Sequence, residues 1–105
     1  MQALYPGCVA PVKSVVIVTS DDAAFDLSTA TGARIVALFA DGNVAAWTAE
    51  LSDESATSLT LTREHEADDV PEGTEGVAYL HAEVDLPAST QPVKSGRSPV
   101  TVAKV

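Results

Sequence analysis

The chain has little of what disulfide-bonded, redox or membrane-spanning proteins are built from. Its 105 residues include a single cysteine, Cys8, so no internal disulfide can form, which fits synthesis in a reducing cytoplasm. The apolar run Val15–Val18 is far shorter than the roughly 20 residues that a membrane-spanning helix needs. Aromatic residues make up only 5% of the chain, which predicts a thin core. We therefore expect one small domain and no membrane partner.

Positive charge is also scarce. Six lysine and arginine residues stand against 15 acidic residues, and the formal net charge is −9. Residues 1–20 and 86–105 contain no acid, whereas all 15 acids lie between residues 21 and 85 beside only two arginines. An acidic surface repels phosphate backbones, so we expect no nucleic-acid partner. Two interpretations stay open: the acids solvate the surface and aid solubility, or the acid-free ends dock on the acidic body of a neighbouring copy.

Motifs for phosphate, dinucleotide or nucleophilic chemistry are absent as well. The chain contains no P-loop, no G-x-G-x-x-G fingerprint and no G-x-S-x-G nucleophile elbow. Its two histidines are distant in sequence from Cys8, so no local Cys–His pair is indicated. No basic patch with interleaved aromatics supports binding of single-stranded nucleic acid. We predict a protein that is not an enzyme and carries no cofactor.

Two polar stretches remain as candidate sites, each with a structural interpretation beside the functional one. His81, Glu83 and Asp85 alternate along one segment and are candidate metal ligands. Zinc sites usually hold more nitrogen or sulfur ligands, so the favoured interpretation is a polar strand face and no metal site. Residues 63–69, REHEADD, contain groups for acid–base work or calcium binding. The proline and glycine that follow do not match a calcium loop, so we expect a solvated loop.

What the chain does contain is a series of short apolar segments separated by turn signals. Hydrophobic residues make up 46% of the sequence, which excludes disorder. Glycine in Asp41-Gly42 accepts positive φ, which is typical of a hairpin turn. The predicted strands are Val15–Thr19, Arg34–Ala40, Val44–Leu51, Thr57–Arg63, Val77–Leu86 and Val100–Val105. Their spacing favours an all-β, immunoglobulin-like antiparallel β-sandwich of about six to seven strands, with a small barrel as the alternative.

Alternation within these segments predicts the core. Leu59 and Leu61 share one face of the clearest period-2 strand, and polar residues occupy the other face. Residues 34–40 are apolar on both faces, as expected for a central strand buried on both sides or lying at an interface. We expect Trp47 in the core and Tyr79 on an exposed face. Further inward positions are Ala45, Ala49, Leu51, Ala78, Leu80, Ala82, Val84, Leu86, Val100 and Val102.

The first 12 residues are predicted to form an irregular arm, and residues 13–105 the folded domain. Pro6, Gly7 and Pro11 interrupt any regular element in the arm. The apolar residues of the arm have no obvious local partner, so they either fold back on the domain or pack on a neighbour. We expect removal of residues 1–12 to leave the fold intact and to weaken assembly. Residues 87–99 form a proline-rich connection that is too long for a tight hairpin.

Within residues 13–105, a set of short motifs occurs in a recognisable order. They are Asp26-Leu27-Ser28-Thr29-Ala30-Thr31, the strand Ile35–Phe39, the turn Asp41-Gly42, the returning strand Val44–Leu51, the turn Val70-Pro71-Glu72-Gly73 and the closing Pro99–Val102. In this order they resemble the small immunoglobulin-like structural proteins of tailed-bacteriophage particles.

The resemblance implies a non-enzymatic structural component of a tailed-phage or prophage virion, made in the bacterial host cytoplasm. It implies assembly in multiple copies, as a homo-oligomer and with other virion proteins, at the capsid surface, neck, tail or baseplate. The arm and loops would carry the contacts. The candidate interface residues are Leu4, Tyr5, Val9, Lys13, Lys94, Arg97 and Lys104. The alternatives are a surface- or carbohydrate-binding sandwich module and a small hydrolase or metal-dependent enzyme.

Overall fold

The computed structural model describes residue 4 and residues 13–19, 26–66, 68–71, 73–87 and 91–102. The described strands are β1 (Lys13–Thr19), β2 (Gly32–Leu38), β3 (Val44–Thr48), β4 (Glu50–Ser52), β5 (Ser58–Glu64), β6 (Gly76–Asp85), β7 (Val93–Lys94) and β8 (Ser98–Val102). A short 3₁₀ helix, η1 (Leu27–Thr29), begins at Asp26, whose side chain accepts a hydrogen bond from the Ser28 backbone N–H.

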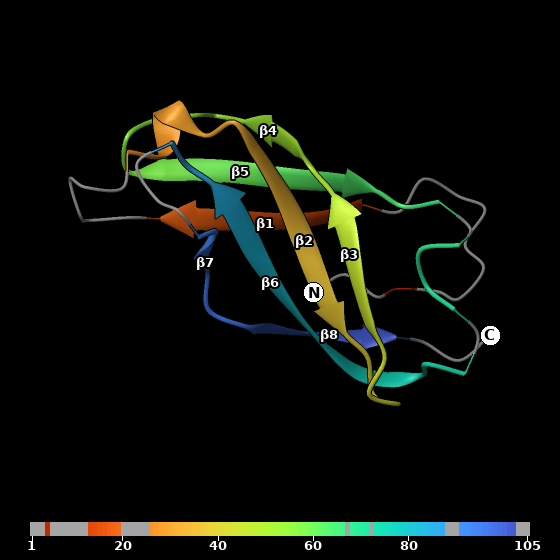
Figure 1. The fold of residues 1–105 in the computed structure, drawn as a ribbon. Helices are drawn as coiled ribbons and strands as arrows, with labels where there is room; N and C mark the ends of the chain where they lie inside the picture. The colour runs from red at the N-terminus through yellow and green to blue at the C-terminus, as the bar shows by residue number, and fades with distance from the viewer. Residues whose placement is uncertain are drawn as a thin grey trace.

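The strands form two antiparallel sheets (Figure 1). One sheet has the order β1-β5-β4. The other has the order β3-β2-β6, and both β7 and β8 pair with β6. This strand order is that of an immunoglobulin-like sandwich, in which strands A, B, E and D form one sheet and strands C, F and G the other. In this chain β1, β5 and β4 take the places of B, E and D. The predicted all-β sandwich is confirmed, and the barrel alternative is wrong because the chain forms two separate sheets.

The predicted strand that returns from the Asp41-Gly42 turn, residues 44–51, is divided between the two sheets. Residues up to Thr48 pair with β2, whereas Glu50–Ser52 pair with β5. Ala49 lies at the crossing and donates its N–H to the Ala33 carbonyl. Every second residue of this segment is apolar and faces the core on both sides of the crossing. One continuous segment therefore contributes to both sheets. With the short strand β7, which lies in the expected 87–99 connection, the described strands number eight.

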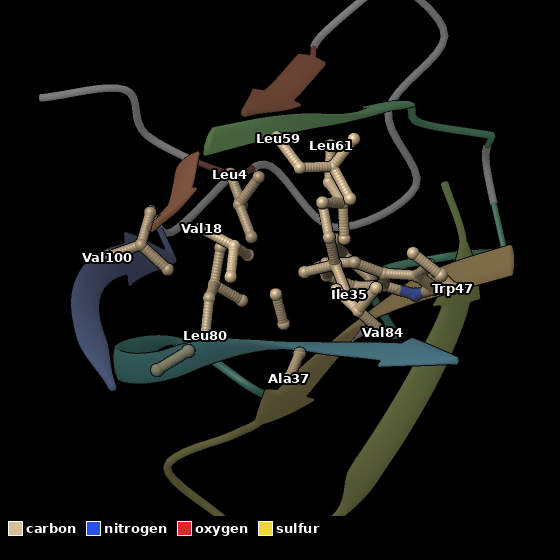
Figure 2. Packing of buried hydrophobic residues seen from close by; sticks show 14 of the residues in the cluster. Leu4, Val18, Ile35, Ala37, Trp47, Leu59, Leu61, Leu80, Val84 and Val100 are labelled. Carbon is tan, nitrogen blue, oxygen red and sulfur yellow. The ribbon is translucent and has the colours of Figure 1, made fainter. Parts of the chain in front are cut away.

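Side chains from the inner faces of both sheets meet in one core (Figure 2). Leu59 and Leu61 point inward from β5, and Ile35 and Val84 point toward them from β2 and β6; all four are fully buried. Trp47 lies at one end of this cluster and is also buried, as predicted. Along β2 the inward positions are buried and the outward positions are half-buried, so the described residues cover the inner face of this central strand completely and its outer face in part.

Leu4 belongs to the core of its own domain. Its side chain is 1% exposed, and its backbone N–H donates to the Thr101 carbonyl at 2.9 Å, beside a parallel bridge to Val102. Of the two roles expected for the apolar arm residues, Leu4 takes the first. Removing residues 1–12 would therefore take a buried leucine from the core, at a cost of about 2–5 kcal/mol, so the truncation is not expected to leave the fold intact. Tyr5 and Val9 lie outside the described residues.

Gly76, at the start of β6, has a backbone conformation that favours glycine. Gly76 has a φ of 127°, and a Cβ built there would lie 3.0 Å from the Ala40 Cβ. We predict that Gly76→Ala lowers the free energy of unfolding by about 1–3 kcal/mol, because it adds backbone strain and a close contact. Denaturant unfolding measures the loss. Gly96→Ala is the matched control, since its Cβ would meet nothing within 4 Å. Equal stability of the two variants would contradict the assigned strain.

Candidate functional site

A groove runs along the free edge of β1. It has a volume of about 460 Å³, and its other wall is the segment that carries β7 and the start of β8. The lining residues are Ser14, Val15, Val16, Ile17, Val18, Thr19, Leu80, Lys94, Ser95, Gly96, Ser98, Pro99 and Val100. Among the described residues β1 pairs only with β5, so the opposite side of β1 is an open strand edge facing this groove. An extended segment can add to such an edge through backbone hydrogen bonds.

The charge of the groove is opposite to that of the protein. Among the described residues no acid lines it, although the whole chain carries a net charge of −9. Lys94 is part of the lining, Arg97 lies between two lining residues, and Lys13 directly precedes the lining residue Ser14. The structure thus places one candidate interface cation, Lys94, in the groove, and two more, Lys13 and Arg97, next in sequence to lining residues from opposite ends of the chain. Lys104 lies outside the described residues.

These three cations differ in how strongly they are engaged. Lys13 forms an exposed ion pair with Glu64 at 3.4 Å, and Lys94 lies 4.0 Å from Glu83. Exposed pairs of this kind contribute little, so both ammonium groups remain open to another partner. Arg97 is exposed and forms no ion pair with any described residue. The groove therefore offers accessible positive charge at its border.

The β1 strand also exposes apolar side chains. Val15 and Ile17 are 55% and 63% exposed on the outer face of the three-stranded sheet. Soluble proteins usually protect an edge strand of this kind with charges, prolines or a covering segment. Between its first and last residues β1 contains no charged residue and no proline. Its sequence is therefore suited to pairing with another strand.

A second apolar surface crosses the outer face of the other sheet. Val44, Leu38, Tyr79 and Pro99 lie directly opposite one another in register across β3, β2, β6 and β8. Val44 and Tyr79 are 65% and 42% exposed. Tyr79 is the one exposed aromatic residue in the described part of the chain, in agreement with the prediction for this residue. A single tyrosine is a small platform for stacking a sugar ring.

The candidate metal ligands on β6 lie in an ion-pair network. Arg34 on the neighbouring strand β2 donates to Glu83 at 3.1 Å and to Asp85 at 3.2 Å. The His81 ring lies 3.1 Å from the second Glu83 oxygen. This hydrogen bond, together with Arg34 and Lys94, outweighs burial and lowers the pKa of Glu83. The carboxylates already face a guanidinium group, so this surface is a polar strand face in which positive charge is supplied by side chains.

Three buried polar side chains, linked by hydrogen bonds, lie at the start of β1 beside the groove. The Ser14 hydroxyl lies 2.7 Å from His65 Nε2, and His65 Nδ1 lies 2.9 Å from an Asp69 carboxylate oxygen. All three residues are buried, and the His65 side chain is 1% exposed. Because an ionised carboxylate can only accept, Nδ1 donates to Asp69, and in the neutral imidazole Nε2 then accepts a hydrogen bond from the Ser14 hydroxyl. The Trp47 ring packs edge-on against His65 at 4.5 Å between ring centres.

Arg63 completes this network. Its guanidinium binds both oxygens of Asp69, at 2.8 and 2.7 Å, and also reaches the Thr48 carbonyl. Burial acts to raise the pKa of Asp69, but the hydrogen bonds from Arg63, His65 and the Glu66 backbone outweigh it, and the pKa of Asp69 is lowered. The prediction that residues 63–69 form a solvated loop is therefore wrong for His65 and Asp69, which are buried. This loop is fastened to β1 and to the end of β3.

The alternation of β5 explains why this polar chain forms. Leu59 and Leu61 face inward, and the same parity carries Arg63 and His65 inward after them. On β1 the matching inward position is Ser14, which lies directly opposite Arg63. The core thus changes from apolar to polar along one pair of strands. Continuing the period-2 pattern past Leu61 is the signal that identifies His65 from sequence, whereas its contact with Ser14, 51 residues away, is visible only in the fold.

Chemically, the buried chain has two possible uses. Serine, histidine and aspartate in this hydrogen-bonded order are the groups of a nucleophilic triad. Paired on all sides by Arg63, Trp47 and backbone groups, they also serve as a fully satisfied polar network that fixes a loop. Every buried side-chain nitrogen and oxygen among the described residues has a hydrogen-bond partner, which fits the second use.

We predict that Asp69→Asn lowers the free energy of unfolding by about 1.5–3 kcal/mol, because it weakens hydrogen bonds to a charged group. The pKa of Asp69 is lower in the folded state, so its contribution is complete well above the ordinary value of 3.8 and is lost as the pH falls below it. Unfolding measured from neutral to acidic pH should show this loss in the parent and a smaller one in the variant. The neighbouring Asp68→Asn is the control, since Asp68 is exposed; equal effects of both would contradict the assignment.

Comparison with protein-family models, curated proteins and solved structures finds no match to this chain. Among the described residues, no helix has the length and apolar character needed to cross a membrane. Function must therefore be inferred from the groove, the open strand edge and the polar networks of this chain.

Proposed function

We propose that this protein is a non-enzymatic structural module that assembles in multiple copies in a tailed-phage or prophage particle. One observation supports the assembly most directly: within the described residues, an apolar edge strand with one open side borders a groove without acids on an otherwise acidic protein. Such an edge is normally protected in proteins that remain monomeric. Complementary charge on a partner would steer it to this edge and fix its register.

The setting in a phage particle is supported by the sequence motifs described above and by the immunoglobulin-like strand order. Fold alone does not define function, so the motif order carries this part of the proposal. A module of this kind needs contact surfaces and no reactive centre. The groove beside β1 and the row Val44–Leu38–Tyr79–Pro99 are two such surfaces, which adjoin at Pro99. Together they give one copy an extended contact surface.

We expect sedimentation velocity to show self-association at low salt that weakens between about 50 and 500 mM NaCl, because salt screens charges beyond a Debye length. An antibody raised against the chain should also label tailed particles released by the host. A monomer at every salt concentration, together with unlabelled particles, would overturn the proposed function. Labelling restricted to the host cell surface would instead favour a surface-binding module.

A hydrolase is the second candidate, and the Ser14–His65–Asp69 chain is the observation that favours it. In such a reaction the Ser14 oxygen would attack an ester carbonyl while its proton passes to His65 and then to the departing alcohol; water would release the acyl group. Ser14 lines the groove, but only 5% of its surface is exposed, and the His65 side chain is almost completely enclosed. The enclosure favours the structural use of these groups.

A fluorophosphonate probe distinguishes the two candidates, because it reacts covalently with activated serines. We predict no labelling of the folded protein, since the Ser14 hydroxyl is enclosed by its hydrogen-bond partner and the strand. Ser14→Ala and the exposed Ser28→Ala serve as a matched pair. Labelling that disappears in Ser14→Ala and persists in Ser28→Ala would establish a reactive serine and refute the non-enzymatic proposal.

A further inference from the structure

We infer that the groove beside β1 receives the opposite edge of the same sheet from a second copy, namely the acidic segment Glu50–Glu54 that contains β4. This inference rests on the proposed assembly in multiple copies and names the two surfaces that meet. Figure 1 shows β1 and β4 on opposite sides of β5, so each copy presents one edge of each kind. Because β1 and β4 both run antiparallel to β5, they run in the same direction, so joining them with the inner faces on one side would extend the sheet from copy to copy through a parallel pair.

Charge complementarity identifies the second copy as the occupant. The described lining of the groove contains Lys94 and no acid, and Lys13 and Arg97 are next in sequence to lining residues. The segment 50–54, ELSDE, contains three acids and no cation, and all three acids are exposed. None of these three carboxylates forms an ion pair with a described residue. Lys13 and Lys94 have weak ion pairs within the chain, whereas Arg97 and the three acids of segment 50–54 have none among the described residues.

Backbone pairing supports the same arrangement. Within the described residues β4 pairs only with β5, and β1 pairs only with β5, so each has one open side. Leu51 is half-buried between exposed neighbours, which gives β4 the alternation of a half-buried strand. The groove offers exposed apolar side chains at Val15, Ile17 and Pro99. Strand addition therefore supplies hydrogen bonds, and the border charges select the partner.

The two surfaces differ, so the contact is heterologous. A heterologous contact repeats from copy to copy and closes into a ring or continues as a filament, depending on the rotation between neighbours. An isologous pair, such as two β1 edges facing each other, would stop at a dimer. Charge also disfavours that alternative, because it would bring the cations at the two groove borders together.

Charge reversal tests the inference on the full chain. Arg97→Glu alters the groove, and the double variant Glu50→Lys/Glu54→Lys alters the acidic edge. We expect each to weaken self-association by about 10-fold or more in sedimentation velocity, since like charges replace complementary ones. Glu75→Lys is the control, because it changes an exposed acid outside both surfaces and should leave association unchanged.

Mixing the two variants distinguishes a heterologous from an isologous contact. Each variant alone should be largely monomeric, but the mixture should form complexes, because the unaltered groove of one meets the unaltered acidic edge of the other. A chain that carries both changes should regain self-association. If the parent self-associates and none of the charge changes affects it, the inference is wrong while assembly stands. A parent that stays monomeric under all conditions overturns the inference, and together with unlabelled particles it overturns the proposed function as well.

Discussion

The packing of β5 against β2 and β6 is the interaction on which the rest of the structure depends. Leu59 and Leu61 meet Ile35 and Val84 across the sandwich, and all four are removed from solvent. Burying an aliphatic side chain of this size contributes about 1.5–3 kcal/mol to the free energy of unfolding. Few aromatic side chains add to this, since Phe39 and Trp47 are the aromatic residues of the described core. The two sheets are held together mainly by this strip of leucine, isoleucine and valine, and Trp47 closes its end.

The same alternation that builds the apolar strip also ends it. Beyond Leu61 the inward positions of β5 are Arg63 and His65, which need polar partners once they are enclosed. Asp69 supplies them by binding both side chains, and Ser14 pairs with the remaining histidine nitrogen. The acidic loop is thereby fastened over the end of the core. His65 and Asp69 lie in a segment that the sequence predicts to be solvent-exposed. They are buried because the inward positions at the end of β5 place polar side chains at the edge of the core.

Strand order then determines which sheet edges have an open side among the described residues. β1 and β4 lie at the two edges of a three-stranded sheet, and the groove beside β1 is bordered by residues from both ends of the chain. The acids of the central region and the cations of the termini are separated in sequence by many residues. Folding turns that separation into two edges of opposite charge. An extended sheet across copies is the simplest use of such a pair of edges.

The sequence by itself determined the strands, their inward faces and the all-β class, because period-2 alternation and turn residues act locally. Leu59, Leu61, Trp47, Tyr79 and the 76–85 strand lie as that pattern predicts. Only the tertiary structure decided the division of residues 44–52 between the sheets, the burial of His65 and Asp69, and the placement of Lys94 in the groove beside β1. Each depends on which distant strand becomes a neighbour, and local alternation contains no information about that choice.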